Sequence, residues 1–167
     1  QVKETNFAGL GIYFNTTDMV EDFIKMVEEY KPDLIGLSAV ELTFNMGMGL
    51  VNAIKSIKPD IKVAVGGSHA ITSPELVINE KNVDIVCIGE AENAFIELCN
   101  KLKNEEDYTG IFNLWIKKNG KIYKNKLGNL INLDDIPYQD WEIFDKRRIY
   151  KPMSGTIGRT GCFELTR

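Results

Sequence analysis

The stretch IKVAVGGSHAITSPE, residues 61–75, joins a short apolar run to a glycine pair and then to a helix start. The run is rich in Val and ends at Gly66 and Gly67, where the backbone carries no side chain and can approach another group closely. Ser73 and Pro74 follow with the residue types preferred at an N-cap and at the first helical position. The stretch therefore predicts a buried strand, a bare turn and a helix.

The same theme recurs on both sides of this stretch. DLIGLS (residues 33–38) and VDIVCIGE (residues 83–90) are short apolar runs that end in small or polar residues. Apolar spacing of three and four residues predicts further helices between and around them. These helices are expected over residues 18–30, 49–57, 73–80 and 91–102. Alternating strands and helices predict an α/β fold with a flavodoxin-like (Rossmann-like) doubly wound parallel sheet.

The pattern changes after residue 108. Two β-rich runs flank Asn119-Gly120, which is a strong signal for a β-hairpin turn. The residues beyond the hairpin are irregular and rich in turn formers, so we expect an extended linker there. The predicted organisation is an α/β domain over residues 1–108, with the β-hairpin and linker over residues 109–167.

Composition excludes several classes of function. The 167 residues carry a net charge of −4 without a basic stripe, so a nucleic-acid face is not expected. No apolar run approaches the roughly 18 residues that a membrane span needs, and no signal peptide is recognised. Cys87, Cys99 and Cys162 are an odd number without CxxC spacing, which indicates neither disulfides nor zinc. A cytoplasmic setting follows, with Cys87 and Cys99 predicted as core residues.

The candidate site lies where the three predicted parallel strands end. Ligands of open parallel sheets bind beyond the carboxyl ends of the strands, so the three terminal stretches should meet at one rim. The candidate ligand-binding residues are Ser38, Ala39, Val40, Gly66, Gly67, Ser68, His69, Gly89 and Glu90. Phosphate-binding fingerprints fail, because Phe14 and Asn52 stand where the third glycine of GxGxxG belongs. A nucleotide-binding module is therefore the weakest alternative.

Three stretches together resemble a known family. KPDLIGLSA (31–39), IKSIKPDIKVAVGGSHA (54–70) and VDIVCIGEAENAFIELCNKL (83–102) look like the cobalamin-binding domain that precedes the barrel of many radical S-adenosylmethionine (radical SAM) enzymes. LDDIPYQDWEIFD (133–145) resembles the linker to that barrel, and FELTR (163–167) resembles the barrel's first strand. The resemblance implies a domain that binds and positions cobalamin and has no catalytic residue of its own.

The resemblance also implies roles for the rim residues. Ser38 would lie beside the nucleotide tail of cobalamin, the Gly66–Gly67 pair would border its slot, and Gly89 with Glu90 would close the far side. On this basis Gly67→Val is expected to abolish cobalamin retention and to leave the fold unchanged. The family's Asp-x-His-x-x-Gly motif is absent, so His69 is expected to make polar contacts at the rim rather than to ligate cobalt, and no metal ligand is assigned.

The resemblance extends to the rest of the protein. A barrel in the same chain would hold a [4Fe-4S] cluster and S-adenosylmethionine and would carry out a methyl transfer or another radical reaction. The alternative is a domain without cobalamin that serves as a structural or substrate-docking module. The family's first strand is not matched here, and VKETNF (2–7) would be its second. We therefore expect strand 33–38 to pair edge to edge in a homodimer, or GLGIYFN (9–15) to fill the place beside it.

Overall fold

The computed structural model describes residues 17–138, 140–143, 150–153 and 156–159. The chain forms two compact units, Gln1–Leu130 and Ile131–Arg167, and each is described by itself. The expected strand over residues 2–7, the run 9–15 and the barrel-like segment 163–167 lie outside the described residues.

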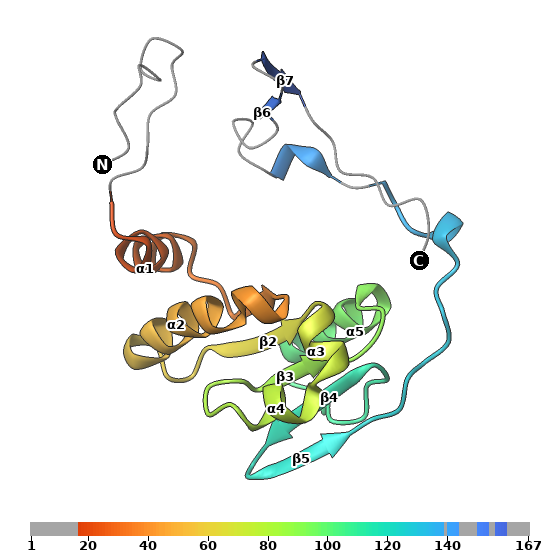
Figure 1. Cartoon of the computed structure of the whole chain (residues 1–167). Coiled ribbons are helices and arrows are strands. Elements are labelled where there is room, and N and C mark those ends of the chain that lie inside the picture. Colours follow the sequence, from red (N-terminus) through yellow and green to blue (C-terminus); the bar gives the residue numbers. More distant parts are fainter. Residues whose placement is uncertain (1–16, 139, 144–149, 154–155, 160–167) are drawn as a thin grey trace. The chain divides into compact units, whose positions relative to one another are not determined.

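The first unit is built on a five-stranded sheet whose strands follow one another in chain order (Figure 1). β1 (Leu34–Ser38), β2 (Lys62–Gly66) and β3 (Ile85–Cys87) are parallel, as predicted. β4 (Leu114–Lys118) and β5 (Lys121–Lys124) continue the same sheet in antiparallel fashion. The sheet is therefore mixed, and its parallel half brings the ends of β1, β2 and β3 to one rim.

Helices cover both faces of the sheet, which confirms the doubly wound arrangement. They are α1 (Met19–Tyr30), α2 (Glu41–Ile57), α3 (Ser68–Thr72), α4 (Pro74–Asn79) and α5 (Glu92–Lys103). One core cluster joins Val63 and Val65 of β2 to residues of α2, α3 and α4, and we call this side the α2 face. A second cluster joins Ala64 of β2 to Ala94 and Leu98 of α5, and we call that side the α5 face.

α2 begins at Glu41, directly after its N-cap Val40, which is eight residues before the predicted start at residue 49. Gly47 and Gly49 lie inside the helix and interrupt its apolar pattern, so the spacing did not predict a helix over residues 41–48. Gly47 has a packing reason, because a Cβ there would lie 2.7 Å from Cδ1 of Leu37. The missing side chain lets α2 cross β1 at close range.

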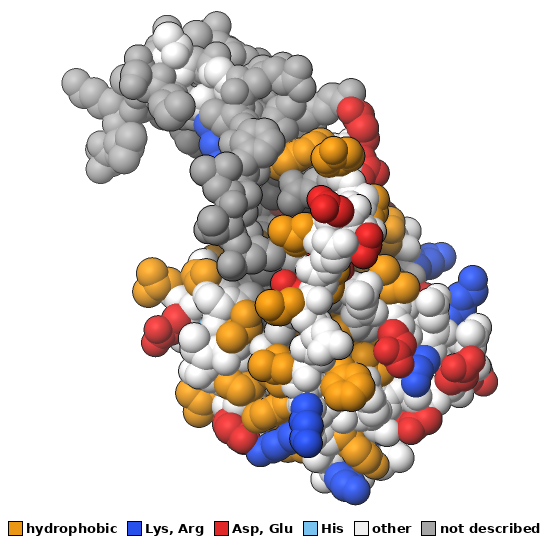
Figure 2. Space-filling model, turned by 90° about the vertical axis from the view of Figure 1, so that its right-hand side faces the viewer, with side chains coloured by type: hydrophobic (Ala, Val, Ile, Leu, Met, Phe, Trp, Pro, Cys, Tyr) orange, Lys and Arg blue, Asp and Glu red, His pale blue; other side chains and the backbone are white. Residues whose placement is uncertain are grey.

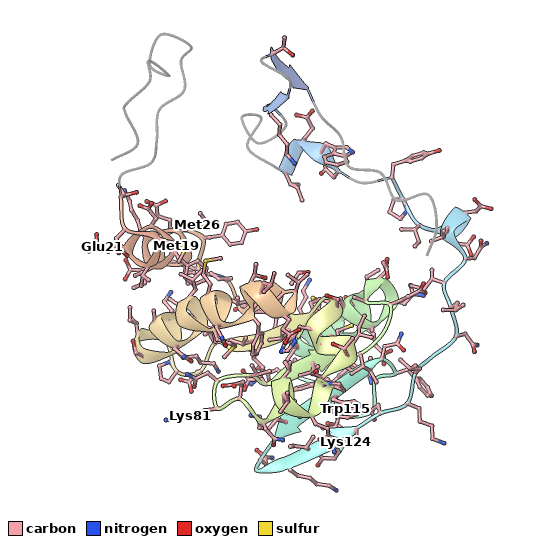
Figure 3. The ribbon with its side chains drawn as sticks, in the orientation of Figure 1. Met19, Glu21, Met26, Lys81, Trp115 and Lys124 are labelled. Carbon is pink, nitrogen blue, oxygen red and sulfur yellow. The ribbon has the colours of Figure 1, made fainter. Side chains whose placement is uncertain are left out.

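The hairpin forms as predicted. Asn119 and Gly120 have φ values of 52° and 73°, the left-handed conformations that a tight two-residue turn requires. Lys124 lies over the ring of Trp115, with its Nζ 4.9 Å from the ring centroid (Figure 3). Trp115 is partly buried against the α2-face cluster. Because β4 pairs with β3, the hairpin belongs to the same compact unit as the parallel strands, and the division between the two units falls after Leu130.

The second unit has little regular structure among its described residues. Two short 3₁₀ turns occur at Leu133–Asp135 and Trp141–Ile143. β6 (Tyr150–Met153) and β7 (Thr156–Arg159) pair as an antiparallel ribbon. The ribbon was not predicted, because Pro, Gly and Ser interrupt its apolar alternation.

The two cysteines of the described chain have different environments. Cys87 is buried in β3, as predicted, whereas Cys99 is exposed, so its assignment to the core is wrong. The apolar stripe of α5 passes through Ala94 and Leu98, and Cys99 is one residue further around the helix. Among the described helices, none is both long and apolar enough for a membrane span. The cytoplasmic setting stays a prediction.

Candidate functional site

The loops after β1 and β2 are joined by backbone hydrogen bonds. The N–H of Ala39 donates to the carbonyl of Gly66 at 3.0 Å, and the N–H of His69 donates to the carbonyl of Ala39 at 3.3 Å. Gly67 lies between them with φ of +89°, and a Cβ there would lie 2.6 Å from the Ala39 oxygen. The space in which a side chain at position 67 would lie is therefore already occupied by the backbone of Ala39. This corrects the expectation that Gly67→Val would leave the fold unchanged.

A strip of small residues lies on the α5 face of β1 and β2. Leu37 packs on the opposite, α2 face. Because successive residues of a strand face opposite sides of the sheet, its neighbours Gly36 and Ser38 lie on the α5 face. Ser38 pairs in register with Gly66. A Cβ on Gly36 would have no heavy atom within 4 Å, and one on Gly66 would meet only Cβ of Cys87 at 3.7 Å. We call Gly36, Ser38 and Gly66 the open strip.

Other predicted site residues lie around this strip at the same rim. Val40 is the N-cap of α2 and is half exposed, while Ser68 is exposed at the start of α3. The ring of His69 packs against Phe44 of α2, with ring centroids 4.6 Å apart. Because Phe44 belongs to the α2-face cluster, the imidazole lies across the sheet from the open strip. The loops converge as predicted, but His69 has an apolar ring contact in addition to its backbone bonds.

The third rim loop follows β3. The Cys87 thiol donates a hydrogen bond to the carbonyl of Gly89 at 3.2 Å. Burial raises the pKa of the Cys87 thiol, and the nearby Glu92 carboxylate adds to this rise. The thiol therefore stays protonated at neutral pH and serves as a donor. Since Cys87 also borders Gly66, the third loop is connected to the other two at the rim.

Two residues of this region were missed by the sequence analysis. Gly36 belongs to the open strip, and the alternation that places Ser38 on the α5 face could have identified it. Asn113 is buried, with 9% of its surface exposed, and its side-chain amide donates to the carbonyl of Glu90 at 2.9 Å. No local pattern predicts this second contact, because the two residues are 23 positions apart.

The amino ends of the parallel strands, opposite the rim, carry an ion pair and a shallow hollow. Asp84, which precedes β3, accepts hydrogen bonds from Nζ of Lys55 and from the N–H of Val63, both at 2.9 Å. A shallow hollow of about 430 Å³ is lined by residues 32–33 and 57–61. These contacts fix the amino ends of the strands, away from the rim. Within the described ranges, no three His, Cys, Asp or Glu side chains are grouped for a metal ion.

Apolar side chains are exposed close to the rim in sequence. Leu42, on the first turn of α2, is 94% exposed, and Val40 and Ile71 are each about half exposed. Figure 2 shows hydrophobic side chains gathered between charged ones on the face that it presents. Exposed apolar side chains are ordinary one by one, and they indicate a partner surface where they form a contiguous patch.

Comparisons with known proteins place this geometry in context. The chain is 31% identical over 147 residues to the uncharacterised methyltransferase PH0819 of Pyrococcus horikoshii, covering 84% of this chain and 32% of that protein. It thus spans about a third of that relative.

Two solved structures share the fold. The cobalamin-dependent radical SAM enzyme OxsB, solved with aqua-cobalamin and S-adenosylmethionine, matches with a TM-score of 0.57 at 21% identity over 67% of this chain and 16% of that one. The radical SAM methyltransferase TsrM of Kitasatospora setae, solved with cobalamin and a [4Fe-4S] cluster, matches with a TM-score of 0.53 at 15% identity over 84% and 24%.

A family model described as the B12 binding domain matches residues 8–99, which is more than half of the chain and includes all three rim loops. This chain therefore belongs to the B12-binding domain family.

Proposed function

We propose that this chain binds cobalamin at the rim of its parallel strands, with the nucleotide tail of the cofactor along the open strip. The observation that carries the proposal is the strip itself. Gly36 and Gly66 leave the α5 face of β1 and β2 without side chains at the point where the family-matched loops converge. A bulky planar group needs this kind of bare wall to lie against backbone.

The residues at the rim fit such a ligand in different ways. Gly36 and Gly66 would hold the tail through backbone contact, and the exposed Ser38 hydroxyl offers it a hydrogen-bond donor and acceptor. Ala39 and Gly67 would keep the slot's end rigid through their mutual packing. When bound, cobalamin supplies a cobalt-centred carrier for a methyl group. This chain's own residues bind and orient it, and none of them is assigned a catalytic role.

We also propose that the whole protein is a radical SAM methyltransferase. Support comes from the relative in P. horikoshii, which is named a methyltransferase, and from the two radical SAM enzymes that share the fold. The exposed apolar residues Val40, Leu42 and Ile71 are consistent with it. Those residues would contact a barrel in the same chain that holds a [4Fe-4S] cluster and S-adenosylmethionine. The reaction would then take place on the barrel side of the rim.

The experiment is reconstitution of the full-length protein with hydroxocobalamin, followed by desalting and visible absorption spectroscopy. Wild type should retain the corrinoid absorbance. Gly36→Val, whose new side chain projects into open space, should lower the affinity about tenfold or more, because the added methyl groups occupy the slot. Gly110→Val is the matched control, since a Cβ at Gly110 also meets nothing within 4 Å.

The outcomes separate the alternatives. Wild type without corrinoid would support the structural or substrate-docking module instead. Equal retention by wild type and Gly36→Val would show that the cofactor does not use the open strip.

A homodimer through β1 is a further proposal about partners. Among the described strands, β1 pairs only with β2. Because the N–H of Ala39 points to β2, the N–H groups of Gly36 and Ser38 point away from it. Such free groups favour pairing with another strand. Light scattering of this chain should show a dimer fraction that grows as the protein concentration is raised. A monomer at every concentration would contradict the proposal.

A further inference from the structure

Asn113 connects two segments through all four of its hydrogen-bonding groups. Its backbone carbonyl accepts from the N–H of Ile88 at 2.8 Å, and its amide Nδ2 donates to the carbonyl of Glu90 at 2.9 Å. Its backbone N–H donates to the carbonyl of Lys126 at 3.0 Å, and its Oδ1 accepts from the N–H of Gly128 at 2.7 Å. Two bonds therefore reach the third rim loop and two reach the segment after the hairpin.

The glycines beside Asn113 show how tightly these segments are held. A Cβ on Gly89 would lie 3.0 Å from Oδ1 of Asn113 and 2.9 Å from Cδ2 of Leu127. A Cβ on Gly128 would lie 3.3 Å from Cβ of Phe112. Residues 126–128 thus lie directly against residues 88–90, and neither glycine can carry a side chain without displacing a neighbour.

We propose that Asn113 is a positioning residue of the cofactor site. It fixes the third rim loop and holds residues 126–128 along that loop as the outer wall of the site. This inference rests on the proposed function, and it extends the site beyond residues 8–99, which the family model matches. The hairpin is then a part of the binding site as well as an extension of the sheet.

The chemistry of the position explains why an asparagine stands there. Its φ of +66° is left-handed, a conformation that Asn and Gly tolerate better than other residues. An amide also offers a donor and an acceptor at one branch point, which a carboxylate does not. Gly would keep the backbone conformation and lose both side-chain bonds. Asp would keep the acceptor for Gly128 and lose the donor for Glu90.

These differences define the variants, made in the full-length protein. Asn113→Gly should loosen both segments, because each loses its side-chain bond and keeps its backbone bond, whereas Asn113→Asp should loosen only the rim loop. Asn125→Ala is the matched control, because the Asn125 amide donates to the carbonyls of Thr109 and Leu114 at 2.9 and 2.8 Å, and neither of these residues belongs to a rim loop. All three lose amide hydrogen bonds in the same hairpin region, so a general loss of stability affects them alike.

Two measurements test the role: hydroxocobalamin affinity by absorbance titration, and amide hydrogen exchange without cofactor. Affinity should fall about tenfold or more in Asn113→Gly, which loses two side-chain bonds, and about fivefold in Asn113→Asp, which loses one, and it should stay near wild type in Asn125→Ala. Exchange at the Gly128 amide should accelerate in Asn113→Gly but not in Asn113→Asp. Exchange at Ile88 should accelerate in both.

The failures are distinguishable. If wild type binds the corrinoid and both Asn113 variants bind it as tightly as Asn125→Ala, the positioning role is overturned and the proposed function stands. Unchanged exchange at Ile88 in both variants also overturns the role, because the loop would then not depend on the amide. If wild type binds no corrinoid, the proposed function fails and this inference fails with it.

Discussion

The glycines of the rim loops and the glycines of the open strip look alike in the sequence but have opposite surroundings. At Gly67 and Gly89 a Cβ would meet protein atoms at 2.6 and 2.9 Å. At Gly36 it would meet nothing within 4 Å, and at Gly66 only an ordinary contact. A bare position in a loop is thus required by the protein's own packing, while a bare position on the strand face leaves room for another molecule.

This difference separates stability from binding. Substitution at a crowded glycine forces backbone or side chains to move, and this lowers the free energy of unfolding whether or not a ligand is present. Substitution at an open glycine changes only the surface that a ligand would use. The two classes of variant should therefore affect different measurements: the free energy of unfolding for a crowded glycine and the cofactor affinity for an open one.

The largest effect is expected for Gly67→Val. The substitution combines a left-handed φ of +89° with a clash against backbone atoms of Ala39, which are not free to move. We expect a loss of about 3 kcal/mol or more in the free energy of unfolding. Urea denaturation followed by circular dichroism measures it. Gly36→Val serves as the partner variant and should change the free energy by less than about 0.5 kcal/mol. Similar losses in both would break the distinction between the two classes of glycine.

A smaller effect is expected for Gly89→Ala. The new methyl group would meet Cδ2 of Leu127, the mobile end of a side chain, and Oδ1 of Asn113, which Gly128 holds in place. We expect a loss of about 1 kcal/mol, measured by the same denaturation. The double variant with Asn113→Gly sharpens the result, because removing the Asn113 side chain should relieve part of the clash. Strict additivity of the two single losses would argue against contact between them.

Much of the fold was predictable because it depends on local patterns. The Val-rich run before Gly66 gave β2, Asn119-Gly120 gave the hairpin, and Ser73-Pro74 gave the start of α4. The meeting of the three rim loops also followed, since parallel strands of one sheet end at the same edge. These features are encoded within a few residues of where they appear.

The remaining features depend on residues that meet only in the folded chain. The partner of Gly67 is Ala39, which lies 28 positions earlier, so the reason for that glycine could not be deduced from its neighbours. Asn113 and Glu90 are similarly distant. The early start of α2 was hidden because Gly47 is explained by Leu37 on another element. Cys99 shows the limit of periodicity, since a shift of one position around a helix decides between core and surface.

The hairpin turn has a consequence for how the site is assembled. β4 and β5 are joined by two residues, with Lys118 opposite Lys121, whereas β1 and β2 are joined by residues 39–61. Closing a short loop costs the unfolded chain less entropy than closing a long one. The part of the proposed site that lies outside the family match is therefore built next to a strand pair whose formation demands less ordering of the chain than the pairing of β1 with β2.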